Sequence, residues 1–220
     1  MVATNPDVTR RALMFAARKL RVIQWHESVD LIEVVHDPVT GDLDLPPDGM
    51  VLGLLDKQQG GRLANTVTMN EIRSHGEGGP TMQIASQRDV KVGISPQETN
   101  RANLENWWYT DLSSVVPDAS GAVTFGVESL PDVIIKRTVA YAKHTYKGLP
   151  WYIAFIGNRT TISDSSDQEN TDAAVPGYPY TINFQGDDEL GGDPVIVDIF
   201  GSGWALIQED GVDTGFEAGS

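Results

Sequence analysis

The stretch DVKVGISPQETNRANLENWWYTD, residues 89–111, decides the fold because it joins the end of a strand to the start of a helix. Ser95 is a good N-cap residue, since its hydroxyl can accept a hydrogen bond from a free N–H of the first helical turn. Pro96 suits the first helical position, where a missing N–H costs nothing. Glu98 lies three residues after Ser95 and would complete a capping box. The pattern predicts a helix that begins directly after Ser95.

The predicted helix has an apolar face. Leu104, Trp107 and Trp108 are spaced i, i+3, i+4 and share one side. Arg101 and Glu105 are i, i+4 neighbours on the opposite side. The spacing favours an amphipathic helix that the two tryptophans anchor in an otherwise β-rich core, and the alternative is a ligand site built on the tryptophans.

The rest of the chain is rich in short β-like runs separated by Gly, Pro and Asp. Residues 149–156, LPWYIAFI, are nearly all apolar and predict a central strand. Lys147 and Gly148 form a turn that predicts an antiparallel hairpin with the run before it. Further strands are expected at residues 31–36, 51–55, 66–72, 81–85, 91–94, 122–127, 133–145, 178–184, 194–200 and 203–207.

These runs predict an all-β fold, a sandwich or partial barrel of about ten strands with one packed α-helix. We divide the chain into an N-terminal segment at residues 1–49, a β-domain at 50–207 and a flexible tail at 208–220. Within the first segment, apolar residues recur with helical spacing over residues 7–23, which favours a helix there.

The charge is unevenly distributed. The net charge of −15 argues against a dedicated nucleic-acid binder, which should carry a basic stripe. Five cations lie close to the start, and residues 160–220 hold 13 acids and no Lys or Arg. The two ends of the chain therefore carry opposite charge. The residues that could pair across a contact between subunits are Arg10, Arg11, Arg18, Lys19 and Arg21 with Asp187, Asp188, Glu189 and Asp193.

The residues give little support for catalysis or for a cofactor. The chain has no cysteine, which excludes disulfides and thiolate chemistry, and its four histidines show no close metal-ligand spacing. The glycine-rich run at residues 74–80 lacks the phosphate-loop pattern, and no Gly-x-Ser-x-Gly elbow is present. We expect no enzyme activity, no cofactor and no metal. No apolar run approaches the length of a membrane span, so no membrane partner is expected.

Two local features leave other functions open. Asp164, Asp167, Glu169 and Asp172 could coordinate calcium, although a solvated acidic loop is the commoner role of such a run. The aromatic side chains Trp151, Tyr152, Tyr178 and Tyr180 would suit a sugar-binding face if they were exposed. A carbohydrate-binding sandwich is therefore the first alternative function, and a hydrolase that uses a carboxylate pair is a weaker one.

Several short motifs resemble the major tail tube proteins of long-tailed bacteriophages. They are VLGLLDKQQGG at residues 51–61, the alternating segment that follows it, and the ETNR-x-x-L run at residues 98–104. DPVIVDIFGSGW at residues 193–204 resembles the last strands of the same family. The resemblance covers roughly residues 50–205 and involves no catalytic motif.

The resemblance implies a structural subunit of the virion tail, made in the cytoplasm of the host bacterium. Such subunits form hexameric rings that stack head to tail into a tube, with other tail proteins at the ends of the tube. DNA would pass through the lumen without tight binding. The same resemblance would make residues 7–23 a strand or an arm that reaches a neighbour, in place of a helix.

Overall fold

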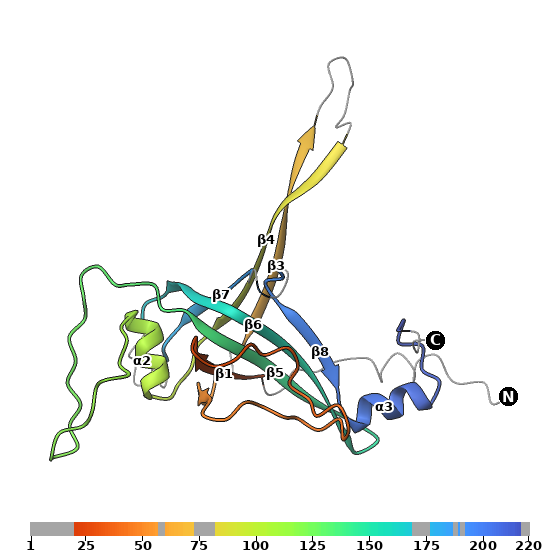
Figure 1. Cartoon of the computed structure of the whole chain (residues 1–220), viewed down its shortest axis with the longest axis horizontal. Coiled ribbons are helices and arrows are strands. Elements are labelled where there is room, and N and C mark those ends of the chain that lie inside the picture. The colour runs from red at the N-terminus through yellow and green to blue at the C-terminus, as the bar shows by residue number, and fades with distance from the viewer. Residues whose placement is uncertain are drawn as a thin grey trace.

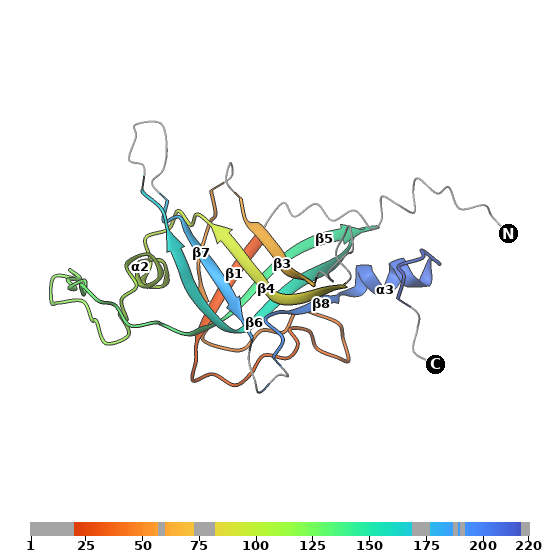
Figure 2. The same ribbon diagram turned by 90° about the horizontal axis from the view of Figure 1, so that it is seen from above.

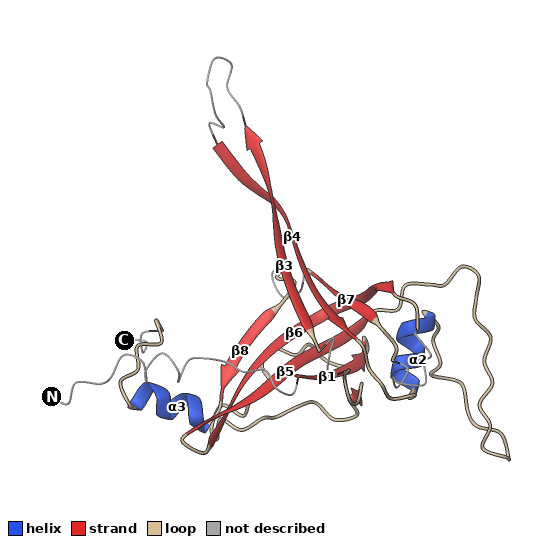
Figure 3. Cartoon of the chain, turned by 180° about the vertical axis from the view of Figure 1, so that it is seen from behind, coloured by secondary structure: helices blue, strands red, loops and turns tan. Residues whose placement is uncertain are grey.

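The computed structural model describes residues 20–56, 60–72, 82–168, 177–186, 189 and 192–216. In these residues the elements follow the order β1 (Leu20–His26), β2 (Met50–Val51), β3 (Arg62–Ile72), β4 (Met82–Ile94), α2 (Arg101–Trp108), β5 (Lys136–Tyr146), β6 (Leu149–Ser165), β7 (Tyr180–Gln185), β8 (Ile196–Phe200) and α3 (Ser202–Glu209). The two helices lie at opposite ends of the sheet (Figure 3).

The strands form one antiparallel sheet, which confirms the expected mainly-β fold. Its order is β2-β1-β5-β6-β7-β4-β3, and β8 pairs with β6 outside this path. β6 pairs with β5 along one side, while its other side pairs first with β8 and then with β7. The part of the chain that the structure describes holds eight strands and two helices, where about ten strands and one helix were expected.

The sheet curls until its two ends approach each other (Figure 2). A Cβ atom at Gly61, just before β3, would overlap the side chain of Leu20 on β1. The concave face holds a core of buried side chains from both ends of the sheet, including Val22, Val90 and Ile182. The architecture is thus a partial barrel made from a single sheet, and α2 lies over one end of its interior.

A second core lies on the outer face of β1, β5 and β6, where Trp25, Val139 and Ile156 are buried. The connection from β1 to β2 covers this face, because its residues Ile32 and Val35 are buried in the same cluster. The central strands are therefore buried on both faces, which explains why residues 149–156 read as an unbroken apolar run.

β3 and most of β4 leave the sheet as a two-stranded ribbon that stands out from the body (Figure 1). All eleven residues of β3 are exposed, and so are the first seven of β4. Residues 82–85 and 91–94, which were predicted to lie in separate strands, belong to the single strand β4, and residue 81 lies outside the described residues. The register of β3 against β4 shifts between Thr68 and Met69.

The strand predicted at residues 203–207 is wrong, because these residues lie in α3. Gly201 ends β8 with a φ of 114°, and a Cβ atom there would lie 2.7 Å from the Pro150 carbonyl oxygen. The chain turns at this close approach to the β5–β6 hairpin. Trp204 and Ile207 then pack on Trp151 with the spacing of a helix.

Two other predicted strands are absent. At residues 31–36 the side chains of Asn158 and Asp198 accept hydrogen bonds from the Ile32 and Val35 N–H groups, in place of a strand partner. Residues 122–127 have no regular secondary structure and pair with no strand in the described residues. The helix predicted over residues 7–23 is wrong at residues 20–23, which belong to β1, and residues 7–19 lie outside the described part.

The expected hairpin between β5 and β6 and the alternation in β7 are both confirmed. Lys143 pairs with Tyr152 across the hairpin, and Lys147 adopts the left-handed conformation at its turn. Tyr180, Ile182 and Phe184 of β7 are buried. The division at residues 49 and 207 stays a prediction, although β1 already belongs to the sheet. Neither helix of the described residues is long and apolar enough to cross a membrane.

We expect the substitution Ile182→Ala to lower the free energy of unfolding by about 2–5 kcal/mol, because it leaves a cavity inside the partial barrel. Ile84→Ala, on the exposed ribbon, is the matched control and should change it by less than about 0.5 kcal/mol. Urea unfolding of the isolated subunit measures both. Equal losses would mean that the ribbon packs against the body.

Candidate functional site

The helix α2 begins five residues later than predicted. Its N-cap is Asn100, whose side-chain oxygen accepts a hydrogen bond from the Asn103 N–H at 3.0 Å. Ser95 does not cap the helix, because its carbonyl bonds the Asp56 N–H and Pro96 forms a β-bridge with Leu55. The chain thus prolongs the strand ladder beyond β4 before it turns into the helix.

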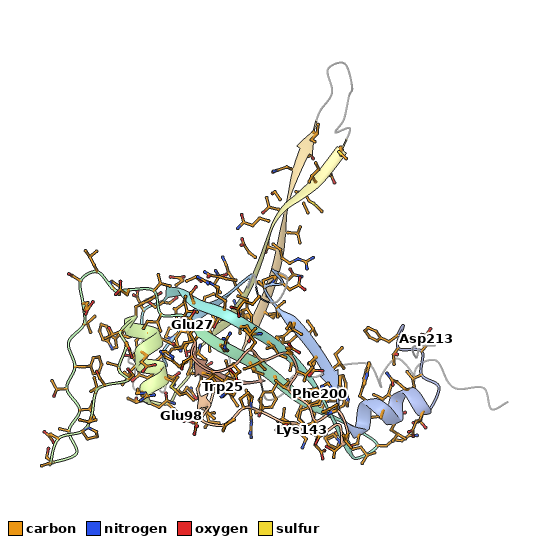
Figure 4. All side chains as sticks on the ribbon, viewed as in Figure 1. Trp25, Glu27, Glu98, Lys143, Phe200 and Asp213 are labelled. Atoms are coloured by element: carbon orange, nitrogen blue, oxygen red, sulfur yellow. The ribbon has the colours of Figure 1, made fainter. Side chains whose placement is uncertain are left out.

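Glu98 has a different role from the one predicted. Its carboxylate accepts a hydrogen bond from the Leu54 N–H at 2.9 Å. A Cβ atom at Gly53 would overlap this carboxylate, so glycine is required there, and Gly53 adopts a φ of 82°. Glu98 therefore ties the connection before α2 to the segment after β2, near the base of α2 (Figure 4).

The face that α2 buries is polar, although the sequence indicated an apolar one. Three of its four buried side chains are Asn103, Glu105 and Asn106. Leu104 and Trp107 pack on the core as partly buried residues, and Trp108 is 39% exposed. The predicted anchoring by both tryptophans therefore holds for Trp107, which also donates a hydrogen bond to the Ser166 carbonyl at 3.2 Å, and not for Trp108.

The polar face of α2 contacts three strands through a connected cluster. We call this cluster the polar anchor, and it consists of Gln24, Asn103, Glu105, Asn106, Lys136 and Tyr180. Its members come from α2 and from β1, β5 and β7.

Lys136 is the cation of the polar anchor. Its ammonium donates to Glu105 at 2.8 Å and to the Asn106 side-chain oxygen at 2.9 Å. Both side chains of the ion pair are 5% exposed. Burial lowers the pKa of Lys136, and the neighbouring Glu105 carboxylate opposes that shift. The geometry satisfies both charges, which makes the cluster a structural link between the helix and β5.

The amides and the phenol complete the network. Asn106 donates to the Gln24 side-chain oxygen at 2.7 Å and to the Tyr180 hydroxyl at 3.0 Å, and that hydroxyl donates to Asn103 at 3.0 Å. Burial raises the pKa of Tyr180. Every member named here has a partner, as buried polar groups require. All six side chains of the cluster are buried in the single subunit.

The ribbon of β3 and β4 carries a group of exposed apolar side chains. Its large apolar side chains are between 36% and 57% exposed, and they are Leu63, Val67, Met69, Ile72, Met82 and Ile84. The pairing of Ile72 with Met82 places these two side chains and Ile84 on one face near the tip. Figure 4 shows the side chains of the ribbon pointing into open space on both sides.

A second exposed segment connects α2 to β5 and extends away from the body beside α2 (Figure 1). Tyr109 ends the helix with a φ of 52° and its N–H bonds the Glu105 carbonyl. Leu112 is buried, whereas Val116, Leu130 and Val133 are 75–86% exposed. From residue 116 to 135, the hydrogen bonds that the structure describes stay within the turn at residues 118–122.

The residues predicted to pair between stacked subunits are only partly described. Arg21 on β1, Glu189 and Asp193 are exposed. The other candidates, Arg10, Arg11, Arg18, Lys19, Asp187 and Asp188, lie outside the described residues. The charge pairing stays a prediction.

The aromatic side chains considered for sugar binding do not form an exposed face. Trp151, Tyr178 and Tyr180 are buried, and they belong to two different hydrophobic clusters. The calcium hypothesis is not tested, because Glu169 and Asp172 lie outside the described residues.

Comparisons with known proteins add little. No protein-family model and no curated protein matches the chain. A similar solved structure is a chain of the cryo-EM structure of the anti-feeding prophage (AFP) baseplate, 6-fold symmetrised, with 9% sequence identity. The similarity covers 84% of this chain and 93% of that chain with a TM-score of 0.43, which does not establish a common fold.

The cap assignment can be tested at one residue. Asn100→Ala removes the acceptor for the Asn103 N–H and should lower the free energy of unfolding by about 0.5–2 kcal/mol. Asn100→Asp keeps an acceptor at the same place and should retain most of the stability. Chemical denaturation measures both, and equal losses in the two variants would rule out a capping role.

The polar anchor predicts a large effect at Lys136. Lys136→Met removes the buried cation of Glu105 and leaves it only the half-exposed Arg101 at 3.3 Å, so it should lower the free energy of unfolding by up to about 3–5 kcal/mol. The control is Lys147→Met, which removes the exposed ion pair with Asp210 and should leave the unfolding midpoint nearly unchanged. The hypothesis fails if the two variants unfold at the same denaturant concentration.

Proposed function

We propose that the protein is a structural subunit of a bacteriophage tail that forms hexameric rings, and that these rings stack head to tail into a DNA-conducting tube. The observation that carries the proposal is the ribbon of β3 and β4, which exposes apolar side chains on a two-stranded arm. A two-stranded ribbon is marginally stable alone in water. A long exposed arm of this kind is suited to packing against a neighbouring subunit.

The direction of the arm supports assembly by stacking. A head-to-tail contact joins two different surfaces of the same subunit, so one surface must project and another must receive it. The ribbon projects from the body in one direction only (Figure 1). The assignment to a phage tail and the six-fold ring rest on the sequence motifs at residues 51–61, 98–104 and 193–204.

A binding module for carbohydrate is less well supported, because three of the four aromatic side chains considered for it are buried. A role inside the virion also accords with a net charge of −15, since a tube of this charge would let DNA pass without the affinity that a basic wall gives. The pairing of the basic start with acidic residues near the end remains part of the proposal.

The test is assembly of purified protein at increasing concentration, observed by negative-stain electron microscopy and by light scattering after gel filtration. We expect six-fold rings and tubes. The double substitution Met82→Glu and Ile84→Glu on the ribbon should abolish tubes, because it places charge on the apolar face near the tip.

The control is Val39→Glu, which changes an exposed apolar residue outside the ribbon and should assemble like the wild type. Circular dichroism verifies that each variant keeps its fold. A wild-type protein that stays monomeric at every concentration would contradict the proposal, and normal tubes from the double variant would exclude the ribbon from the contact.

A further inference from the structure

Residues 122–127, AVTFGV, have the alternation of a half-buried strand without a strand to pair with. Val123, Phe125 and Val127 alternate with Ala122, Thr124 and Gly126. The segment is neither helix nor strand in the single subunit, and Val123 and Val127 are 52% and 48% exposed. The sequence pattern is typical of a strand that packs one face, and in the part of the chain that the structure describes this segment pairs with no strand edge.

The segment does not leave the body as a random coil. The Asp118 carboxylate accepts hydrogen bonds from the Ser120 N–H at 2.8 Å and from the Ala122 N–H at 3.0 Å. The Asp118 N–H in turn donates to the Ala122 carbonyl at 2.9 Å, and Gly121 takes a φ of 84° inside this turn. The turn fixes the start of the segment and presents the following residues in one direction.

The sheet offers one edge that is long enough to receive this segment. In the residues that the structure describes, β3 pairs only with β4, so its outer edge is open over eleven residues. The other edge strands are shorter than the six-residue segment, because β2 has two residues and β8 has five. An added strand takes its affinity from main-chain hydrogen bonds along such an edge.

Side chains on β3 match those of the segment. Leu63 and Val67 lie on one face of β3 and are 46% and 36% exposed. A strand paired there with Val123 and Val127 on the same face would bury apolar side chains from both partners.

Charge distinguishes this edge from the β8 edge. Residues 109–135 contain four acids and no Lys, Arg or His. The described part of the ribbon has three cations, Arg62, Arg88 and Lys91, against two acids, Glu71 and Asp89, and β8 carries only Asp198. β3 itself is neutral, with Arg62 and Glu71, whereas β8 carries one acid, so charge disfavours the β8 edge for the acidic connection and does not oppose the β3 edge.

We propose that residues 122–127 of one subunit add as a strand to the outer edge of β3 in a second copy of this chain. In the single subunit, the connection that contains the segment lies on the side of α2 away from β3 (Figures 1 and 2). The inference rests on the proposed assembly and specifies one of its contacts. The sheet then continues from subunit to subunit, and the open edge of β3 is covered.

Disulfide cross-linking tests the pairing, because the chain has no cysteine of its own. Subunits with Thr124→Cys are mixed with subunits that carry Ala64→Cys, Thr66→Cys or Thr68→Cys and are then oxidised during assembly. If Val123 and Val127 share the face of Leu63 and Val67, Thr124 shares the other face with these three positions. One of the three mixtures should give a covalent dimer on a non-reducing gel.

Two controls accompany the cross-linking. Asn65→Cys points to the opposite face of β3 and should give no dimer with Thr124→Cys. Ser114→Cys lies in the same connection but outside the segment and should give no dimer with any of the three positions on β3.

Charge substitution gives an independent readout. Val123→Asp with Val127→Asp should abolish assembly while the unfolding midpoint of the monomer stays unchanged, because both side chains are exposed in the single subunit. Val116→Asp is the matched control on the same connection and should assemble like the wild type.

The outcomes separate this contact from the proposed function. Tubes that form normally in the double Asp variant, without any Thr124→Cys cross-link to β3, overturn the strand addition and leave the tube in place. A protein that never assembles overturns both.

Discussion

The ion pair of Lys136 and Glu105 is the contact on which the rest of the architecture depends. It lies where α2 meets β5, and the amides beside it extend the contact to β1 and β7. A buried pair of charges gains little stability over an apolar contact of the same volume, but leaving one charge alone is strongly unfavourable. The helix therefore packs on the open end of the partial barrel in one position and orientation. Because Tyr109 ends that helix in a left-handed conformation, the same contact sets the direction of the connection that follows.

The two projecting parts of the subunit leave the body in different directions. The ribbon rises from the edge of the sheet, and the connection before β5 extends beyond α2 (Figure 1). Both expose apolar side chains, and this exposure does not stabilise the monomer. A subunit with two unlike contact surfaces can join its neighbours within a ring by one and between rings by the other, which is the requirement for a closed ring that also stacks.

The sequence predicted much of the sheet because its strands have a clear pattern. The β5–β6 hairpin and the buried alternation in β7 follow from the turn at Lys147 and from the apolar residues themselves. The start of α2 could not be predicted, because Ser95 and Asn100 are both good cap residues, and the choice depends on the backbone bonds of the segment after β2. The polar anchor was missed because the helix has an apolar face and a polar face, and hydrophobic spacing selects the first. The available signal was the adjacent pair of cations Lys136 and Arg137 inside a β-rich run, since neighbouring strand residues point to opposite faces and a cation that points into the body requires a buried partner.

The order of strands in the sheet has a consequence for how the subunit is made. Two of the pairings in the sheet join strands that are far apart in the chain. Ile23 of β1 pairs with Val139 of β5, and in the described residues the ribbon pairs with the rest of the sheet through β7. On a ribosome, β1 emerges long before β5, with which it makes most of its pairs, and the ribbon has no partner strand in the described part of the body until β7, in the last third of the chain, is complete. Closure of the barrel is therefore a late event with high contact order, which is slow in folding. A chain that stops before β7 leaves the ribbon without its partner strand in the body, so only chains that include β7 present it in an ordered position for a neighbour.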